Sequence, residues 1–342
     1  MNNKATFVHV LAARPNFIKA APLINEISKN GYKNIIVHTN QHYDYLMSKV
    51  FFGELNIPIP DFNLGIESGS HAEQTGNALI EIEKVLIKLN PQYLIVYGDV
   101  NSSLAGALAA SKLNINIIHV ESGCRSYDRT MPEEINRILI DNLSDLLFCT
   151  EESAYNNLID KGFNSNSIFN VGNTAIDSLH NIKINDRVYN YNYYLCTLHR
   201  PFNVDDKKKL NLILEKLNQF DKKVIIPTHP RLKKNIDKKY DNLIFIEPLG
   251  YVDFISALKF SCGVISDSGG VQCETSFMNK PMLTLRKSTE HLLTLSHGNK
   301  LVDVEELHYE SFDTKENKSF PYEWDGNASK RILKEIKRKF KI

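Results

Sequence analysis

The sequence has almost no net charge and little cysteine. Its 342 residues include 41 lysines and arginines against 40 acidic residues, so no net basic field is present for nucleic acid or anionic lipid. The five cysteines are widely spaced and form no Cys-x-x-Cys pair, which argues against a disulfide framework or a zinc site. No apolar run reaches the length of a membrane-spanning helix, and the N-terminal residues lead into a strand-turn-helix pattern. We therefore expect a cytoplasmic protein without a signal peptide, a nucleic-acid partner, a membrane partner or a bound metal.

Strand and helix signals alternate along the chain, and the alternation restarts after the polar stretch 180–192. Strands that are apolar throughout and separated by helices indicate a parallel sheet covered on both faces. The expected strands are 5–13, 34–40, 93–98, 115–120 and 146–150 in the first half, and 193–198, 223–227, 243–246, 263–266 and 282–285 in the second. The prediction is an α/β fold of two Rossmann-like, doubly wound parallel-sheet domains that face each other across a cleft.

Acidic side chains follow two of the apolar strands. Asp99 follows YLIVYG and Glu121 follows IIHV. Ligand groups gather beyond the carboxyl ends of parallel strands, and neighbouring strands lie about 4.8 Å apart, so both carboxylates can reach one small ligand. Glu133 and Glu134 open the next helix after Pro132. The alternative interpretation makes Asp99 and Glu121 helix caps, and makes the acids of the later helix partners of its dipole.

Cationic and polar side chains follow other expected strands, at or near the start of the next helix. Their shared placement favours a set of groups around an anion, and the alternative is a set of solvated turn residues. Arg14 and Lys19 flank the start of the first helix, His199 ends YYLCTL, and His229 and Arg231 follow KVIIPT.

The segment SDSGGVQCE at 266–274 is the most specific local pattern. It follows an expected strand and opens a helix, so Ser268, Gly269 and Gly270 leave backbone N–H groups at a helix N-terminus, where a diphosphate binds well. Glu274 lies one helical turn further on and is placed to accept hydrogen bonds from ribose hydroxyls. An ordinary serine cap is the alternative. The segment is neither a GxGxxG fingerprint nor a Walker loop, which disfavours NAD and ATP chemistry.

These segments resemble the non-hydrolysing UDP-N-acetylglucosamine 2-epimerases, which have the glycosyltransferase-B fold. The matching segments keep their order along the chain: ARPNFIKAAPL (13–23), HTNQHYDYLM (38–47), YGDVNSSLAGALAASKL (97–113), HVESG (119–123), MPEEINRILID (131–141), VGNTAIDS (171–178), THPR (228–231) and SDSGGVQCE (266–274). The resemblance implies an N-terminal domain of residues 1–175 and 327–342, which carries the catalytic carboxylates, and a UDP-binding domain of residues 176–326.

The resemblance also implies a mechanism without a nicotinamide cofactor or a metal. UDP leaves by anti elimination across C1 and C2, a 2-acetamidoglycal forms, and UDP adds again after a proton reaches the opposite face of C2. Asp99, Glu121 and Glu133 match the essential carboxylates, and His199 matches a catalytic histidine. The positions that match substrate-binding groups are Arg14, Lys19, His229, Arg231, Ser268, Gly269, Gly270 and Glu274. The resemblance further implies a homodimer and a role in surface polysaccharide synthesis, such as capsule or lipopolysaccharide.

Some segments depart from the usual family pattern. The GTRPE segment reads AARPN, and the TERPEG-like segment reads Thr289-Glu290-His291-Leu292-Leu293. The segment between Glu121 and Glu133 is more similar to the subgroup that epimerises UDP-2,3-diacetamido-2,3-dideoxyglucuronate. UDP-GlcNAc is the leading substrate and that sugar is the alternative. A hydrolysing epimerase, a UDP-sugar glycosyltransferase of the same fold and a non-catalytic nucleotide-sugar binder are the competing functions.

Overall fold

The computed structural model describes residues 5–40, 52–187, 189–228, 230–312 and 323–342, without the side chains of residues 40, 230 and 231. Contacts group the chain into two compact units, unit 1 with residues 1–182 and 321–342 and unit 2 with residues 183–320. The predicted domain boundaries, which lie after residues 175 and 326, remain a prediction. No helix in the described parts of the chain is long and apolar enough to cross a membrane.

Unit 1 contains a seven-stranded sheet in which every recorded pairing is parallel, with the order β3-β2-β1-β4-β5-β6-β7. Its strands are β1 (Thr6–Leu11), β2 (Lys33–Asn40), β3 (Phe62–Ile66), β4 (Tyr93–Tyr97), β5 (Asn116–Val120), β6 (Leu146–Cys149) and β7 (Ile168–Asn170). The strand order reverses between β1 and β4. In open parallel sheets such a switch point is where ligands bind.

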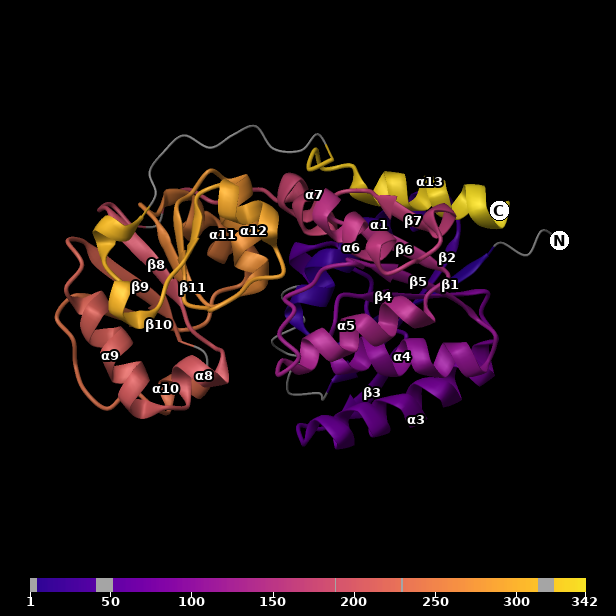
Figure 1. Ribbon diagram of the computed structural model, residues 1–342, viewed down its shortest axis with the longest axis horizontal. Coiled ribbons are helices and arrows are strands. Elements are labelled where there is room, and N and C mark those ends of the chain that lie inside the picture. The colour runs from indigo at the N-terminus through magenta and orange to yellow at the C-terminus, as the bar shows by residue number, and fades with distance from the viewer. Residues whose placement is uncertain (1–4, 41–51, 188, 229, 313–322) are drawn as a thin grey trace. The chain divides into compact units, whose positions relative to one another are not determined.

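Helices cover both faces of this sheet (Figure 1). One layer contains α3 (His71–Leu89), α4 (Asn101–Lys112), α5 (Pro132–Leu143) and α6 (Glu152–Asp160), and the other contains α1 (Arg14–Lys29), α7 (Thr174–Asn181) and α13 (Ala328–Phe340). A short 3-10 helix, η1 (Ser165–Ser167), precedes β7. α3 begins with a reciprocal capping box, in which Ser70 accepts from the Glu73 N–H and Glu73 accepts from the Ser70 N–H.

The C-terminal helix, α13, packs on unit 1, and a side chain of α7 accepts hydrogen bonds from the first N–H groups of α13. The Asp177 carboxylate accepts hydrogen bonds from the N–H groups of Ala328 and Ser329 at 3.0 and 2.8 Å. Trp324 donates its indole N–H to the carbonyl of Thr150, and Gly172 passes beside the backbone of Glu323 with a φ of +86°. A Cβ atom at Gly172 would lie 2.0 Å from the carbonyl oxygen of Glu323, so this crossing needs a glycine.

Unit 2 contains a six-stranded parallel sheet with the order β10-β9-β8-β11-β12-β13. Its strands are β8 (Tyr193–Thr197), β9 (Lys223–Pro227), β10 (Leu243–Ile246), β11 (Val264–Ser266), β12 (Met282–Thr284) and β13 (Asn299–Leu301). Its helices are α8 (Pro201–Val204), α9 (Lys207–Asn218), α10 (Pro230–Lys233), α11 (Tyr251–Phe260) and α12 (Gly269–Phe277), with 3-10 helices η2 (Leu292–Ser296), η3 (Val304–Glu306) and η4 (Tyr309–Ser311). The switch point here lies between β8 and β11.

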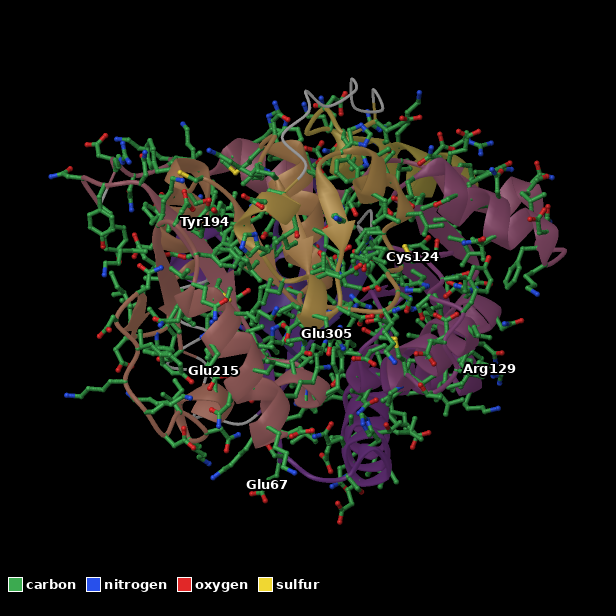
Figure 2. The ribbon with its side chains drawn as sticks, turned by 60° about the vertical axis from the view of Figure 1, so that its left-hand side comes forward. Glu67, Cys124, Arg129, Tyr194, Glu215 and Glu305 are labelled. Carbon is green, nitrogen blue, oxygen red and sulfur yellow. The ribbon has the colours of Figure 1, made fainter. Side chains whose placement is uncertain are left out.

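The core of unit 2 is aromatic at the amino end of β8. Tyr194, labelled in Figure 2, stacks on Phe312 with 5.3 Å between ring centroids and meets Phe220 edge to face. Leu210, Ile213 and other side chains of α9 fill the same cluster. This packing fixes the start of β8, and therefore the position of its carboxyl end.

The predicted α/β architecture of two doubly wound parallel sheets is confirmed, and each expected strand is present with its ends within two residues. Three strands were not predicted, namely β3, β7 and β13. All three are edge strands. β3 is FNLGI and is only partly buried, while β7 and β13 are three residues long. An edge strand needs no continuous apolar run, because one side has no neighbouring strand and its face is less covered.

Candidate active site

In unit 1, Asp99 lies at the switch point, two residues after the end of β4. Its carboxylate forms an ion pair with Arg137 of α5, whose side chain is buried. The N-cap of the following helix, α4, is Val100 and not Asp99. The capping alternative therefore fails for Asp99, and the pairing with Arg137 places its charge between β4 and α5.

Glu121 follows β5, the neighbouring strand, and pairs with Lys19. Lys19 Nζ lies 2.6 Å from Glu121 Oε1, and both side chains are largely buried. Burial alone would lower the pKa of Lys19, but the negative charges of Glu121 and Asp99 together outweigh it and raise the pKa. Lys19 therefore stays charged and is shared electrostatically by both carboxylates. The structure brings together these three predicted site residues.

The backbone around Glu121 is unusual in two places. Glu121 itself has a φ of +72°, a conformation that non-glycine residues rarely adopt and that is often found at functional sites. Gly98, just before Asp99, has a φ of +60°, and a Cβ atom there would lie 3.2 Å from Lys19 Nζ and 3.4 Å from Glu121 Oε1. No helix begins at Glu121, since the next one is α5, so Glu121 is not a helix cap either.

A buried network connects the loops that carry these acids. Asp141 of α5 accepts a 2.6 Å bond from Arg125, lies 2.8 Å from His119 Nδ1, and accepts from the N–H of Gly123. The other ring nitrogen of His119 donates to the carbonyl of Gly98 at 3.1 Å, because a carbonyl only accepts. His119 and Asp141 are both 0% exposed. The network therefore fixes the residue before Asp99 and both sides of Glu121.

Glu133 and Glu134 open α5 but have different surroundings. Glu134 is buried and accepts from the N–H and hydroxyl of Ser126, both at 2.9 Å, so it holds the loop from β5 to α5, on which Figure 2 labels Cys124 and Arg129. Glu133 is half-buried and lines a pocket of about 280 Å³ together with Asp99.

This pocket opens at the switch point of the unit 1 sheet. It extends from the ends of β1 and β4 to the start of α3, and Glu67, labelled in Figure 2, forms part of its wall. Its lining residues are Ala12, Ala13, Ile66, Glu67, Ser68, His71, Gln74, Asp99, Val100, Asn101, Ser102, Pro132, Glu133 and Asn136. An amide chain orders one wall, since Asn136 donates to Asn101, which donates to Gln74. The pocket is polar and acidic where Asp99 and Glu133 face it.

In unit 2, His199 follows β8 and is held by Asp267, which follows the neighbouring strand β11. His199 Nδ1 lies 2.8 Å from Asp267 Oδ1, and Asp267 also accepts from the N–H groups of His199 and Arg200. Burial would raise the pKa of Asp267, but the hydrogen bond and charge of His199 outweigh it and lower the pKa. The His199 ring is 41% exposed, so an ionised carboxylate orients a histidine that solvent or a ligand can reach.

The segment 266–274 adopts the predicted strand-turn-helix form, with Ser268 at the N-cap of α12. The Ser268 hydroxyl makes no capping hydrogen bond to the helix, so the simple serine-cap alternative does not describe it. A Cβ atom at Gly269 would lie 2.6 Å from Glu290 Oε1, whereas Gly270 is exposed and has no other atoms within 4 Å of such a position. The start of α12 is therefore open at Gly270, where a helix N-terminus suits an anion, whereas Gly269 is buried.

Glu274 is deeply buried on α12. Burial raises its pKa to about 7, and its neighbour Tyr251 offsets only part of that effect. A carboxyl with such a pKa changes charge near neutral pH. Hydrogen bonds donated to this carboxyl by a ligand would stabilise its ionised form.

Three predicted substrate-binding residues remain, namely Arg14, His229 and Arg231. Arg14 is the first residue of α1 and is half-buried. His229 and the side chain of Arg231 lie outside the described residues. Within the described parts, no group of three or more histidine, cysteine, aspartate or glutamate side chains could hold a metal ion.

Four structurally important residues were not among the predicted site residues: His119, Arg137, Asp141 and Asp267. Arg137 and Asp141 repeat the four-residue spacing that begins at Glu133, which places all three near one face of α5. That spacing is visible in the sequence. Asp267 directly precedes the predicted Ser268 in the sequence. Its contact with His199 arises because β8 pairs with β11, which brings together the residues that follow these two strands.

The comparisons with known proteins agree with this geometry. A family model described as UDP-N-acetylglucosamine 2-epimerase matches residues 25–337. The chain belongs to this family. Members are epimerases, so the protein is an isomerase.

Individual members of the family are similar over most of their length. A UDP-N-acetylglucosamine 2-epimerase of Methanocaldococcus jannaschii is 46% identical over 84% of this chain and 86% of its own. A UDP-2,3-diacetamido-2,3-dideoxy-D-glucuronate 2-epimerase of Pseudomonas aeruginosa is 43% identical over 84% and 85%. The crystal structure of the M. jannaschii UDP-GlcNAc 2-epimerase with UDP-GlcNAc and UDP matches with a TM-score of 0.86, at 40% identity, over 97% of this chain and 99% of that one. This similarity confirms the glycosyltransferase-B fold.

Replacing Asp141 by asparagine should destabilise unit 1 by about 3 kcal/mol, because Arg125 then stays buried without its carboxylate. Glu81→Gln is the matched control, since Glu81 forms an exposed pair with Lys84, and it should cost less than about 0.5 kcal/mol. Urea unfolding followed by circular dichroism measures both. Equal free energies of unfolding for the two variants would contradict the structural role of Asp141.

The raised pKa of Glu274 predicts a pH dependence of stability. Between the ordinary value of 4.5 and about 7, the unfolded chain loses the proton that the folded chain retains, so folding becomes less favourable as pH rises. Glu274→Gln removes this titration, and its stability relative to the parent should rise by about 3 kcal/mol between pH 4.5 and 7 and then stay constant. Urea unfolding of both proteins at several pH values measures the difference. If the free energies of unfolding of the two proteins change in parallel between pH 4.5 and 7, the raised pKa of Glu274 is contradicted.

Proposed function

We propose that the protein interconverts UDP-GlcNAc and UDP-ManNAc by reversible epimerisation at C2. The observation that carries the proposal is the pair of carboxylates, Asp99 and Glu121, held against cations at adjacent strand ends in a chain of this epimerase family. C2 of the sugar is a weak carbon acid, so the base must be well placed and shielded from water.

The proposed reaction begins when a unit 1 carboxylate takes the proton from C2. The C1–O bond to UDP breaks, its electron pair stays on the phosphate oxygen, and a C1–C2 double bond forms in the 2-acetamidoglycal. A second acid group then returns a proton to the opposite face of C2, and the UDP oxygen attacks C1. Asp99, Glu121 and Glu133 supply these groups in the proposal, and Lys19 offsets the negative charge that gathers there.

In unit 2, the proposal assigns the UDP to the start of α12. The diphosphate accepts from the backbone at Ser268, Gly269 and Gly270, and the ribose hydroxyls donate to Glu274. His199, oriented by Asp267, stabilises the charge on the leaving UDP. Arg14, His229 and Arg231 complete the proposed substrate-binding set.

A second substrate is favoured by one specific observation. The P. aeruginosa relative is named for UDP-2,3-diacetamido-2,3-dideoxy-D-glucuronate, and its identity to this chain, 43%, is close to that of the M. jannaschii enzyme. The ratio of kcat/KM for the two UDP-sugars decides between them. We further propose, from the resemblance, a cytoplasmic homodimer whose product enters surface polysaccharide synthesis.

Epimerisation in heavy water tests the reaction. Product formed from UDP-GlcNAc should carry deuterium at C2, detected by NMR and mass spectrometry, because the returning proton comes from a group that exchanges with solvent. Product without deuterium would contradict the elimination mechanism. Stoichiometric release of free UDP and a free sugar would identify a hydrolysing enzyme, and product formation only with an added acceptor would identify a glycosyltransferase.

A further inference from the structure

A buried histidine, His291, faces the N-terminus of α12 in unit 2. It is only 5% exposed, and its Nε2 lies 3.4 Å from the position that a Cβ atom would occupy at Gly269. Among the described residues, its ring nitrogens have no hydrogen-bond partner, and Glu290 Oε1 is 3.9 Å away. Neither ring nitrogen is among the fully enclosed unpaired polar atoms of the described residues, so a ligand atom can still reach the ring.

The backbone holds His291 in place on both sides. Its N–H donates to the Thr289 hydroxyl at 3.1 Å, and its carbonyl accepts from the Thr294 hydroxyl at 2.7 Å. Thr289 is itself fixed by a 2.6 Å bond to Gln272 of α12. The backbone of His291 is therefore fixed relative to α12 before any ligand binds, and the burial of the ring limits the side-chain freedom that remains to be lost on binding.

The local charges favour an anion at this point. Glu290 is the neighbouring acid, and its carboxylate is balanced by Arg286, whose Nη2 lies 2.6 Å from Glu290 Oε2. The start of α12 contributes a partial positive charge and N–H groups. A ligand oxygen beside Gly269 would thus meet a helix N-terminus and an imidazole donor, with the neighbouring carboxylate already neutralised.

We propose that His291 is a further substrate-binding residue, whose Nε2–H donates a hydrogen bond to a diphosphate oxygen of a nucleoside diphosphate at the start of α12. This inference rests on the proposed function, which places UDP there. It adds a side-chain donor to the backbone groups of the turn. It also explains why a buried imidazole without a hydrogen-bond partner in the described parts of the chain lies beside a glycine-rich helix start.

Binding of UDP and of uridine to three variants tests the proposal. His291→Ala should weaken UDP binding about tenfold in calorimetry, because a donor to the diphosphate is lost, and should leave uridine binding unchanged by ligand-observed NMR. His291→Arg supplies a permanent donor and should bind UDP within about threefold of the parent. The matched control is His308→Ala, which removes an exposed histidine of the same unit.

The outcomes separate this inference from the proposed function. Unchanged UDP affinity in His291→Ala, an equal loss for UDP and uridine, or failure of His291→Arg to restore binding would each overturn the role of His291 in diphosphate binding. If the unsubstituted protein itself does not bind UDP, the proposed function is overturned, and this inference with it.

Discussion

The unit 1 site depends on the hydrogen bonds of the Asp141 carboxylate, which is fully buried. It joins His119, Arg125 and the N–H of Gly123, and His119 continues the connection to the carbonyl of Gly98. A single side chain of α5 thus determines the path of the chain after β4 and after β5. An unpaired charge at this depth is strongly unfavourable, so the Asp141 carboxylate and its partners have to stay together.

This constraint allows unfavourable features nearby. Glu121 has a left-handed backbone conformation, and Lys19 and Arg137 are largely buried cations. Each cation has a carboxylate partner, which offsets the cost of removing it from water. The result is a set of acids whose positions are set by charge pairing within unit 1. In unit 2 the corresponding element is Asp267, which holds His199 across the pairing of β8 with β11.

The sequence predicts the central strands because they are apolar throughout, and it predicts which residues follow them. Asp99, Glu121, His199 and Ser268 can therefore be placed at strand ends from the order of residues alone. Their partners cannot, because Arg137 and Asp267 are distant in sequence from the groups they contact. The edge strands also escape prediction, since FNLGI and NKL lack a distinctive apolar pattern. In the sequence His291 is only a departure from the family pattern, because its burial beside Gly269 depends on tertiary packing.

The central claim is that unit 1 moves the proton and unit 2 holds the UDP. Calorimetry with UDP and a turnover assay on Asp99→Asn and Glu274→Ala test it most directly. Asp99→Asn should bind UDP nearly as well as the parent but have no turnover, and Glu274→Ala should bind UDP at least about tenfold more weakly, a loss of about 1.4 kcal/mol. An equal loss of UDP affinity in both variants would contradict the claim.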